Sequence, residues 1–82
     1  MIKEKKLRKS ITAIHDLLIK IKIMTVNNSS YLEIYNLIDD LEYLPQLITD
    51  KEDRTDLFDQ SLKKLCKKYN FLDVIHKYEK PI

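Results

Sequence analysis

The chain has 82 residues, a formal net charge of +2 at pH 7, a single cysteine and no glycine. This length predicts one domain spanning residues 1–82, and the lone Cys66 excludes an intramolecular disulfide and is typical of a reducing, cytoplasmic compartment. The lack of glycine excludes a glycine-rich phosphate loop and leaves asparagine to take the left-handed positions at helix ends.

The first predicted helix covers residues 3–24. Its apolar residues recur at spacings of four and three, the pattern of a helix that packs along one seam: Leu7, Ile11, Ile14, Leu18 and Ile21. Leu17 and Met24 widen this seam. The same pattern makes a homodimer through this helix one option.

A second helix is predicted after the polar segment at residues 25–30, in which Asn27 or Asn28 can adopt a left-handed conformation. Ser30 and Glu33 have the spacing of a capping box, with Ser30 as the N-cap. The expected core stripe of this helix is Ile34, Leu37, Ile38, Leu41 and Leu44.

Pro45 predicts where the second helix ends. Its ring would clash with the carbonyl of Leu41 in a continuous helix, at a cost of about 3 kcal/mol. We therefore expect the helix to end near Tyr43 and a short new turn to begin at Pro45, from which Leu47 and Ile48 cover the core. Residues 49–56 are polar and predict a loop or a solvated first turn, with Thr49 and Glu52 as a second capping box.

The last part of the chain predicts a helix with a lysine-rich back. Its apolar stripe is Leu57, Phe58, Leu62, Leu65, Cys66 and Tyr69, and its opposite face carries Lys63, Lys64, Lys67 and Lys68. Asn70 is a candidate helix end, after which Leu72, Ile75 and Tyr78 form either a fourth helix or the continuation of one bent helix. The fold class that follows is all-α, a small antiparallel four-helix bundle.

The residues that could carry chemistry do not form a recognisable site. His15, His76 and Cys66 lack the spacing of metal ligands. The acidic residues Asp39, Asp40 and Glu42 are typical of a solvated helix face. We therefore predict no catalytic residue, no metal and no cofactor, and a protein that is not an enzyme.

The charges fall in three blocks: residues 1–24 carry +5, residues 25–62 carry −7 and residues 63–82 carry +4. One interpretation is that the blocks pair with one another across the bundle. The other is a basic surface for an anionic partner, such as a protein, an anionic membrane surface or, less favoured because only two arginines occur, a nucleic acid. Tyr31, Tyr35 and Tyr78 are candidates for partner contact, because tyrosine combines an apolar ring with a polar tip.

The order of these features resembles the immunity proteins of class II bacteriocins, of the pediocin and lactococcin types. The resemblance is carried by "AIHDLLIKI", "SSYLEIYNLIDDLEYLPQLI" and "FDQSLKKLCKKYNFL", spread over about residues 13–72. It implies a cytosolic antiparallel four-helix bundle from a Gram-positive bacterium, which is not an enzyme and protects the producing cell at the inner side of the membrane.

The resemblance also implies where the partner binds. The partner would be a membrane transporter occupied by the bacteriocin, and recognition would lie toward the C-terminal part of the chain. The corresponding partner-binding residues here are Lys63, Lys64, Lys67, Lys68, Phe71, His76, Lys77 and Tyr78. The alternatives are a small nucleic-acid-binding regulator of a phage or mobile element and an adaptor or antitoxin-like module that works through protein contacts.

Overall fold

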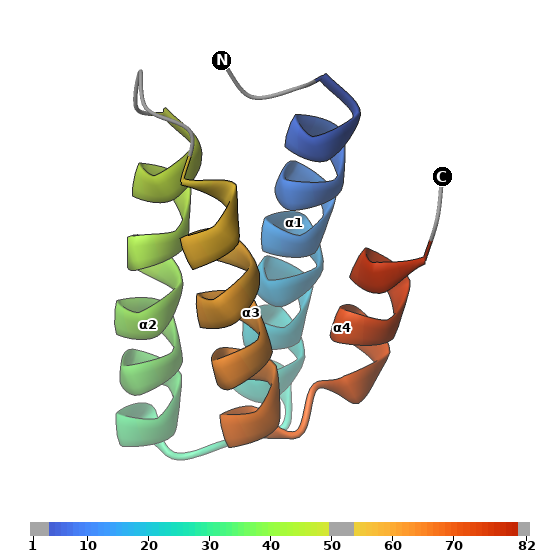
Figure 1. Ribbon diagram of the computed structural model, residues 1–82. Helices are drawn as coiled ribbons and strands as arrows, with labels where there is room; N and C mark the ends of the chain where they lie inside the picture. The colour runs from blue at the N-terminus through green and yellow to red at the C-terminus, as the bar shows by residue number, and fades with distance from the viewer. Residues whose placement is uncertain (1–3, 50–53, 81–82) are drawn as a thin grey trace.

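The computed structural model describes residues 4–49 and 54–80, which form four α-helices in an all-α bundle (Figure 1). The helices are α1 (Glu4–Val26), α2 (Tyr31–Thr49), α3 (Thr55–Tyr69) and α4 (Leu72–Glu79). Each helix runs back along the one before it, so the predicted antiparallel four-helix bundle is confirmed. The open choice between a bent third helix and two helices is also decided, because α3 and α4 are separate.

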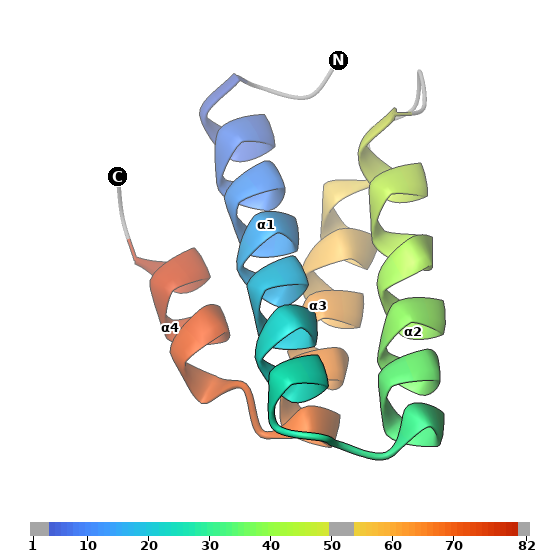
Figure 2. The ribbon, with the colours of Figure 1, turned by 180° about the vertical axis from the view of Figure 1, so that it is seen from behind.

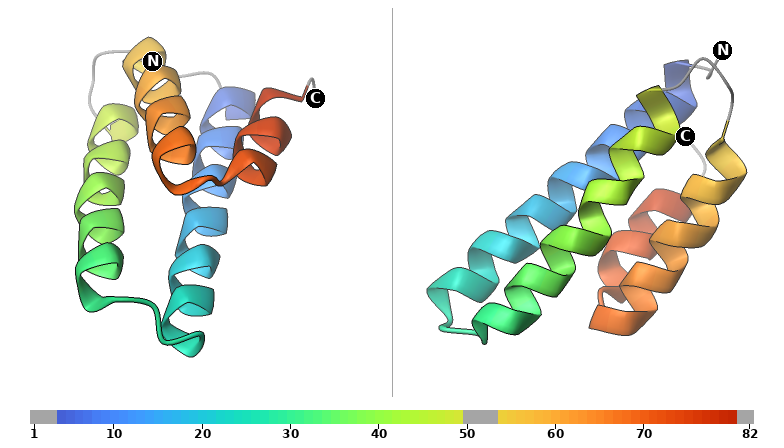
Figure 3. Two further views of the ribbon diagram at one scale, coloured as in Figure 1. Left: turned by 90° about the horizontal axis from the view of Figure 1, so that it is seen from below. Right: turned by 90° about the vertical axis from the view of Figure 1, so that its left-hand side faces the viewer.

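The four helices pack in a ring. α1 packs against α2 and α4, and α3 closes the ring by packing against the same two helices. Seen from behind, α1 lies between α4 and α2 (Figure 2). The hairpin of α1 and α2 is longer than α3 and α4 and extends past them at the end where its two helices are joined (Figure 3).

The core is formed mainly by leucines from α2 and α3. Phe58, Leu37, Leu44 and Leu62 are inaccessible to solvent, and burying each such side chain stabilises the fold by about 1.5–3 kcal/mol. The remaining buried apolar residues are Ala13, Leu17, Leu41, Leu47, Leu65, Cys66, Val74, Ile75 and Tyr78. Leu57 and Leu72, which were expected in the core stripes, are exposed. They lie in the first turns of α3 and α4, where packing against the other helices only begins.

Asparagine ends two of the helices. Asn28 and Asn70 have φ angles of 58° and 61°, in the left-handed region where glycine is usually found. The N–H of Phe71 donates to the carbonyl of Cys66 and that of Asn70 to the carbonyl of Lys67, which is the Schellman pattern of a helix end. The expectation that asparagine replaces glycine at helix ends is therefore confirmed.

At the start of α2, Ser30 is the N-cap, as predicted. Its Oγ accepts a hydrogen bond from the N–H of Leu32 at 3.2 Å. The second predicted capping box, Thr49 with Glu52, lies outside the described side chains.

The prediction for Pro45 is wrong. α2 continues through it to Thr49 instead of ending near Tyr43. Leu44 and Leu47 on either side of Pro45 are both buried, so a continuous helix keeps two leucines in the core. Burying two such side chains is worth at least as much as the roughly 3 kcal/mol that an internal proline costs.

The seam predicted for α1 is also partly wrong. The buried residues of α1 are Ser10, Ala13 and Leu17, with Ile14, Ile21 and Met24 partly buried beside the core. Ile11 and Leu18 are 53% and 47% exposed. The polar contacts of α1 with α3 and α4, described below, favour this rotation of α1.

Within the described ranges, no helix has the length and apolar character needed to cross a bilayer.

Replacing Asn70 with alanine should destabilise the protein by about 1–2 kcal/mol, because a β-carbon without a polar group is disfavoured in the left-handed region. Urea unfolding measures the change. The matched control is Asn36→Ala, an exposed asparagine within α2, which should be neutral or slightly stabilising. Equal effects of the two substitutions would contradict the role given to Asn70.

Candidate partner-binding surface

The four lysines of α3 form the predicted exposed face. Lys63, Lys64, Lys67 and Lys68 all point to solvent, opposite the buried Phe58, Leu62, Leu65 and Cys66. Two of them are used inside the molecule, because Lys63 pairs with Glu79 of α4 at 3.5 Å and Lys68 with Asp40 of α2 at 3.0 Å. Among the described residues, Lys64 and Lys67 have no ion-pair partner, so they are the α3 cations available to a partner.

Asp40 joins α2 to the end of α3. Its Oδ2 accepts hydrogen bonds from Lys68 Nζ at 3.0 Å and from Tyr69 Oη at 2.9 Å. The hydrogen bond to Asp40 raises the pKa of Lys68, whereas burial and then the same carboxylate raise the pKa of Tyr69. Lys68 is therefore engaged within the bundle and remains charged at every physiological pH.

Two aromatic residues of the predicted site have structural roles. Phe71 stacks on Tyr69 with their ring centroids 5.9 Å apart, and Lys20 Nζ lies 5.5 Å from the Phe71 ring. Tyr78 is only 6% exposed. Its ring packs inward on Phe58 at a centroid distance of 5.8 Å, so little of Tyr78 is accessible, and direct contact between Tyr78 and a partner stays a prediction. Tyr31 and Tyr35, by contrast, are exposed on α2.

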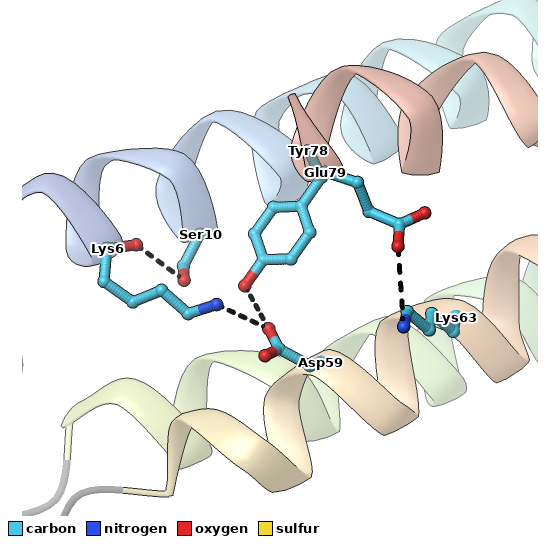
Figure 4. Close-up of polar contacts among 6 residues, drawn as sticks. All are labelled: Lys6, Ser10, Asp59, Lys63, Tyr78 and Glu79. Carbon is cyan, nitrogen blue, oxygen red and sulfur yellow. Dashed lines mark hydrogen bonds and ion pairs between the residues drawn. The ribbon is translucent and has the colours of Figure 1, made fainter. Parts of the chain in front are cut away.

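Tyr78 is the centre of a junction between three helices (Figure 4). Its hydroxyl donates a hydrogen bond to Asp59 Oδ1 of α3, and Lys6 Nζ of α1 reaches the same oxygen at 2.7 Å. Lys6 also lies 4.8 Å from the centre of the Tyr78 ring. Burial and the neighbouring carboxylate raise the pKa of Tyr78. Burial lowers the pKa of Lys6, but its bonds to Asp59 and Tyr78 outweigh this and raise it overall.

The structure brings Lys77 of α4 together with three basic residues of α1. They lie around a groove of about 300 Å³ between α1 and α4, which we call the α1–α4 groove. Its lining residues are Lys5, Arg8, Lys9, Thr12, Ala13, Asp16, Val74, Lys77 and Tyr78. The sequence placed these cations in two separate blocks at opposite ends of the chain, and only the antiparallel packing of α4 on α1 joins them.

The cations of the α1–α4 groove are unequally neutralised. Lys77 pairs with Asp16 at 3.3 Å and Arg8 with Glu4 at 2.8 Å on the exposed surface. Lys9 Nζ lies 5.1 Å from the Tyr78 ring, and within the described part of the chain neither Lys5 nor Lys9 forms an ion pair. The groove thus has a cationic rim over a floor made by Ala13, Val74 and the side of Tyr78, which suits an anionic group attached to an apolar body.

The internal pairing of charge blocks is confirmed for two contacts. Lys6 with Asp59 and Lys68 with Asp40 each join a basic end of the chain to its acidic middle. A further contact, Lys20 with Asp73 at 2.8 Å, joins the two basic ends and lowers the pKa of Asp73. Internal pairing therefore accounts for these lysines, and a basic surface for an anionic partner stays a prediction for the lysines without an ion pair.

Cys66, His15 and His76 do not come together as a site. Cys66 is fully buried and His15 and His76 are exposed. Across residues 4–49 and 54–80, no three His, Cys, Asp or Glu side chains gather closely enough to hold a metal ion. Burial, with a smaller effect of Asp73, raises the pKa of the Cys66 thiol to about 11, so the thiol is protonated at neutral pH.

Comparison of the chain with protein-family models, with curated proteins and with solved structures found no match.

Tyr78→Phe should lower the free energy of unfolding by about 1–2 kcal/mol, because it removes a hydrogen bond to a carboxylate that is partly exposed. Urea unfolding followed by circular dichroism measures this. Tyr35→Phe removes an exposed hydroxyl from α2 and should change stability by less than about 0.5 kcal/mol. A Tyr78→Phe protein as stable as the Tyr35→Phe protein would show that the junction does not hold α4.

Stability should fall as pH rises from about 9 to about 11. In the unfolded chain the Cys66 thiol has its ordinary pKa of 9.0, whereas burial raises this pKa to about 11 in the folded protein. The native state binds the extra proton in this window, so the free energy of unfolding drops by up to about 2–3 kcal/mol. Urea midpoints measured from pH 8 to 11 should decline less in Cys66→Ala, and parallel declines would contradict the raised thiol pKa.

Proposed function

We propose that this protein acts by binding and that it is a bacteriocin immunity protein, which works in the cytosol at a membrane-associated receptor. The antiparallel four-helix bundle is the fold that the resemblance to class II immunity proteins implies. Many unrelated proteins share such bundles, so the fold is compatible with this function but does not identify it. The main support for the proposal has to come from the surface of the protein.

The observation that carries the proposal is the arrangement of unneutralised cations on two faces. Lys5 and Lys9 border the α1–α4 groove, while Lys64 and Lys67 stand on the back of α3. Cations without internal partners attract an anionic surface, and the cytoplasmic face of a membrane carries a negative potential worth about 1 kcal/mol for each nearby lysine. Two such faces suit a protein that meets a receptor next to that membrane.

The arrangement of the titratable groups supports binding over catalysis. The nucleophile with the greatest intrinsic reactivity, Cys66, is held protonated in the core by burial. Four of the residues that line the α1–α4 groove are cations, Lys5, Arg8, Lys9 and Lys77, and Asp16 is already paired to Lys77. Catalysis by a carboxylate or histidine needs a base with a tuned pKa beside the substrate, and this groove offers cations for holding an anion.

A protection assay tests the proposal. Expression of the intact chain in sensitive Gram-positive strains should raise the inhibitory concentration of one class II bacteriocin in a panel by about tenfold or more. Lys5→Glu/Lys9→Glu and Lys64→Glu/Lys67→Glu should each reduce protection. The control Lys80→Glu reverses the charge of an exposed lysine that follows α4 and lies outside the groove, and it should keep protection.

The rival functions give different outcomes in parallel experiments. A nucleic-acid-binding regulator would retard duplex DNA, with an affinity that falls steeply as salt is raised, and would give no protection. An adaptor would give neither result and would co-purify with a soluble protein. Absence of protection across the panel, with normal expression and folding, would overturn the immunity function.

A further inference from the structure

α1 has a second apolar face that the core of the bundle does not use. Ile11 and Leu18 belong to the regular stripe of α1, yet about half of each side chain is exposed. At 100° per residue they lie roughly 150° around the helix from Asp16, which faces α4 through its ion pair with Lys77. Since α1 packs between α4 and α2, this second face borders α2.

α2 presents a matching stripe on the side next to α1. Tyr31, Tyr35 and Ile38 are spaced by four and three residues and are 92%, 66% and 38% exposed. Asp40, which bonds to Lys68 and Tyr69, marks the opposite edge of α2, toward α3. Both stripes therefore lie toward the border between α1 and α2, the pair of neighbouring helices that stands in front of α3 in Figure 2. We call this surface the outer α1–α2 face; its residues are Ile11, Leu18, Tyr31, Tyr35 and Ile38.

The charges of the two helices indicate what can cover this face. At 100° per residue, Lys22 lies beside Ile11 and Leu18 on α1, and Glu42 lies beside Tyr31 and Tyr35 on α2. Among the described residues, neither Lys22 nor Glu42 forms an ion pair. In a contact between two copies related by a two-fold axis, α1 of one copy can lie on α2 of the other, and the reverse contact forms at the same time. Both contacts then place a surface that carries a lysine against one that carries a glutamate, so the charges of this face are complementary to themselves.

We propose that the outer α1–α2 face is a homodimer interface, in which α1 of each protomer packs on α2 of its partner. The two hairpins would meet through their stripes of four-and-three spacing, as the helices of a four-helix bundle do. The dimer buries exposed apolar residues that a monomer leaves in water. This inference concerns a different surface from the α1–α4 groove and does not rest on the proposed function.

Sedimentation equilibrium of the intact purified chain, over micromolar to submillimolar concentrations, tests the interface. The wild-type protein should form a monomer–dimer equilibrium that weakens as salt is raised. Leu18→Lys and Tyr31→Lys should each raise the dissociation constant by about tenfold or more, because each places a charge in the apolar contact. Tyr31 is 92% exposed in the monomer, so lysine there leaves the fold of one chain undisturbed.

Ile19→Lys is the matched control. Ile19 is a 40% exposed aliphatic residue of the same helix, but it lies on the edge that faces α4, beside Asp73 and Lys77. This substitution should leave the dissociation constant unchanged, and circular dichroism should show equal helix content in all variants. A wild-type protein that stays monomeric throughout, or a dimer that Ile19→Lys weakens as much as Leu18→Lys does, would overturn the proposal.

Discussion

The contact on which the rest of the structure depends is the junction of Tyr78, Asp59 and Lys6, where α1, α3 and α4 meet. α4 has eight residues, and a helix of this length does not form alone in water. It persists because Val74, Ile75 and Tyr78 enter the core and because the Tyr78 hydroxyl is satisfied by a carboxylate on α3. Lys6 balances that carboxylate and covers the ring, so one polar cluster fixes the position of α4 and the rotation of α1.

The same network decides which lysines are free to act outside the molecule. Lys6, Lys20, Lys63, Lys68 and Lys77 reach carboxylates on neighbouring helices. Among the described residues, the lysines without an ion pair include Lys64 and Lys67 on the back of α3 and Lys5 and Lys9 along the α1–α4 groove. The proposed binding role therefore draws on residues that contribute least to holding the helices together, which lets a partner use them without weakening the fold.

The sequence predicts the elements better than their orientation. Helix ends at Asn28, Ser30 and Asn70 follow from local backbone chemistry, which needs no knowledge of other helices. The rotation of α1 could not be predicted, because Ile11 and Leu18 fit a seam as well as Ala13 and Leu17 do until the other helices are placed. The error at Pro45 has a related cause: the local cost of an internal proline is visible in the sequence, whereas the packing that lets α2 continue through Pro45 to Thr49 belongs to the assembled bundle. The α1–α4 groove combines residues some seventy positions apart, which no local pattern connects.

The place of α4 at the end of the chain has a consequence for how the molecule opens. Most of the packing joins helices that follow one another in sequence, but α4 closes the ring against α1 at the far end of the chain. The contact between α1 and α4 closes a loop that includes most of the chain. The entropy lost in closing this loop is offset only once the contact between the two helices is complete. Transient release of α4 would therefore dissolve the groove while the other three helices stay packed. Any anion bound between α1 and α4 would stabilise the packed position of α4, so binding in the groove and closure of the fold would be coupled.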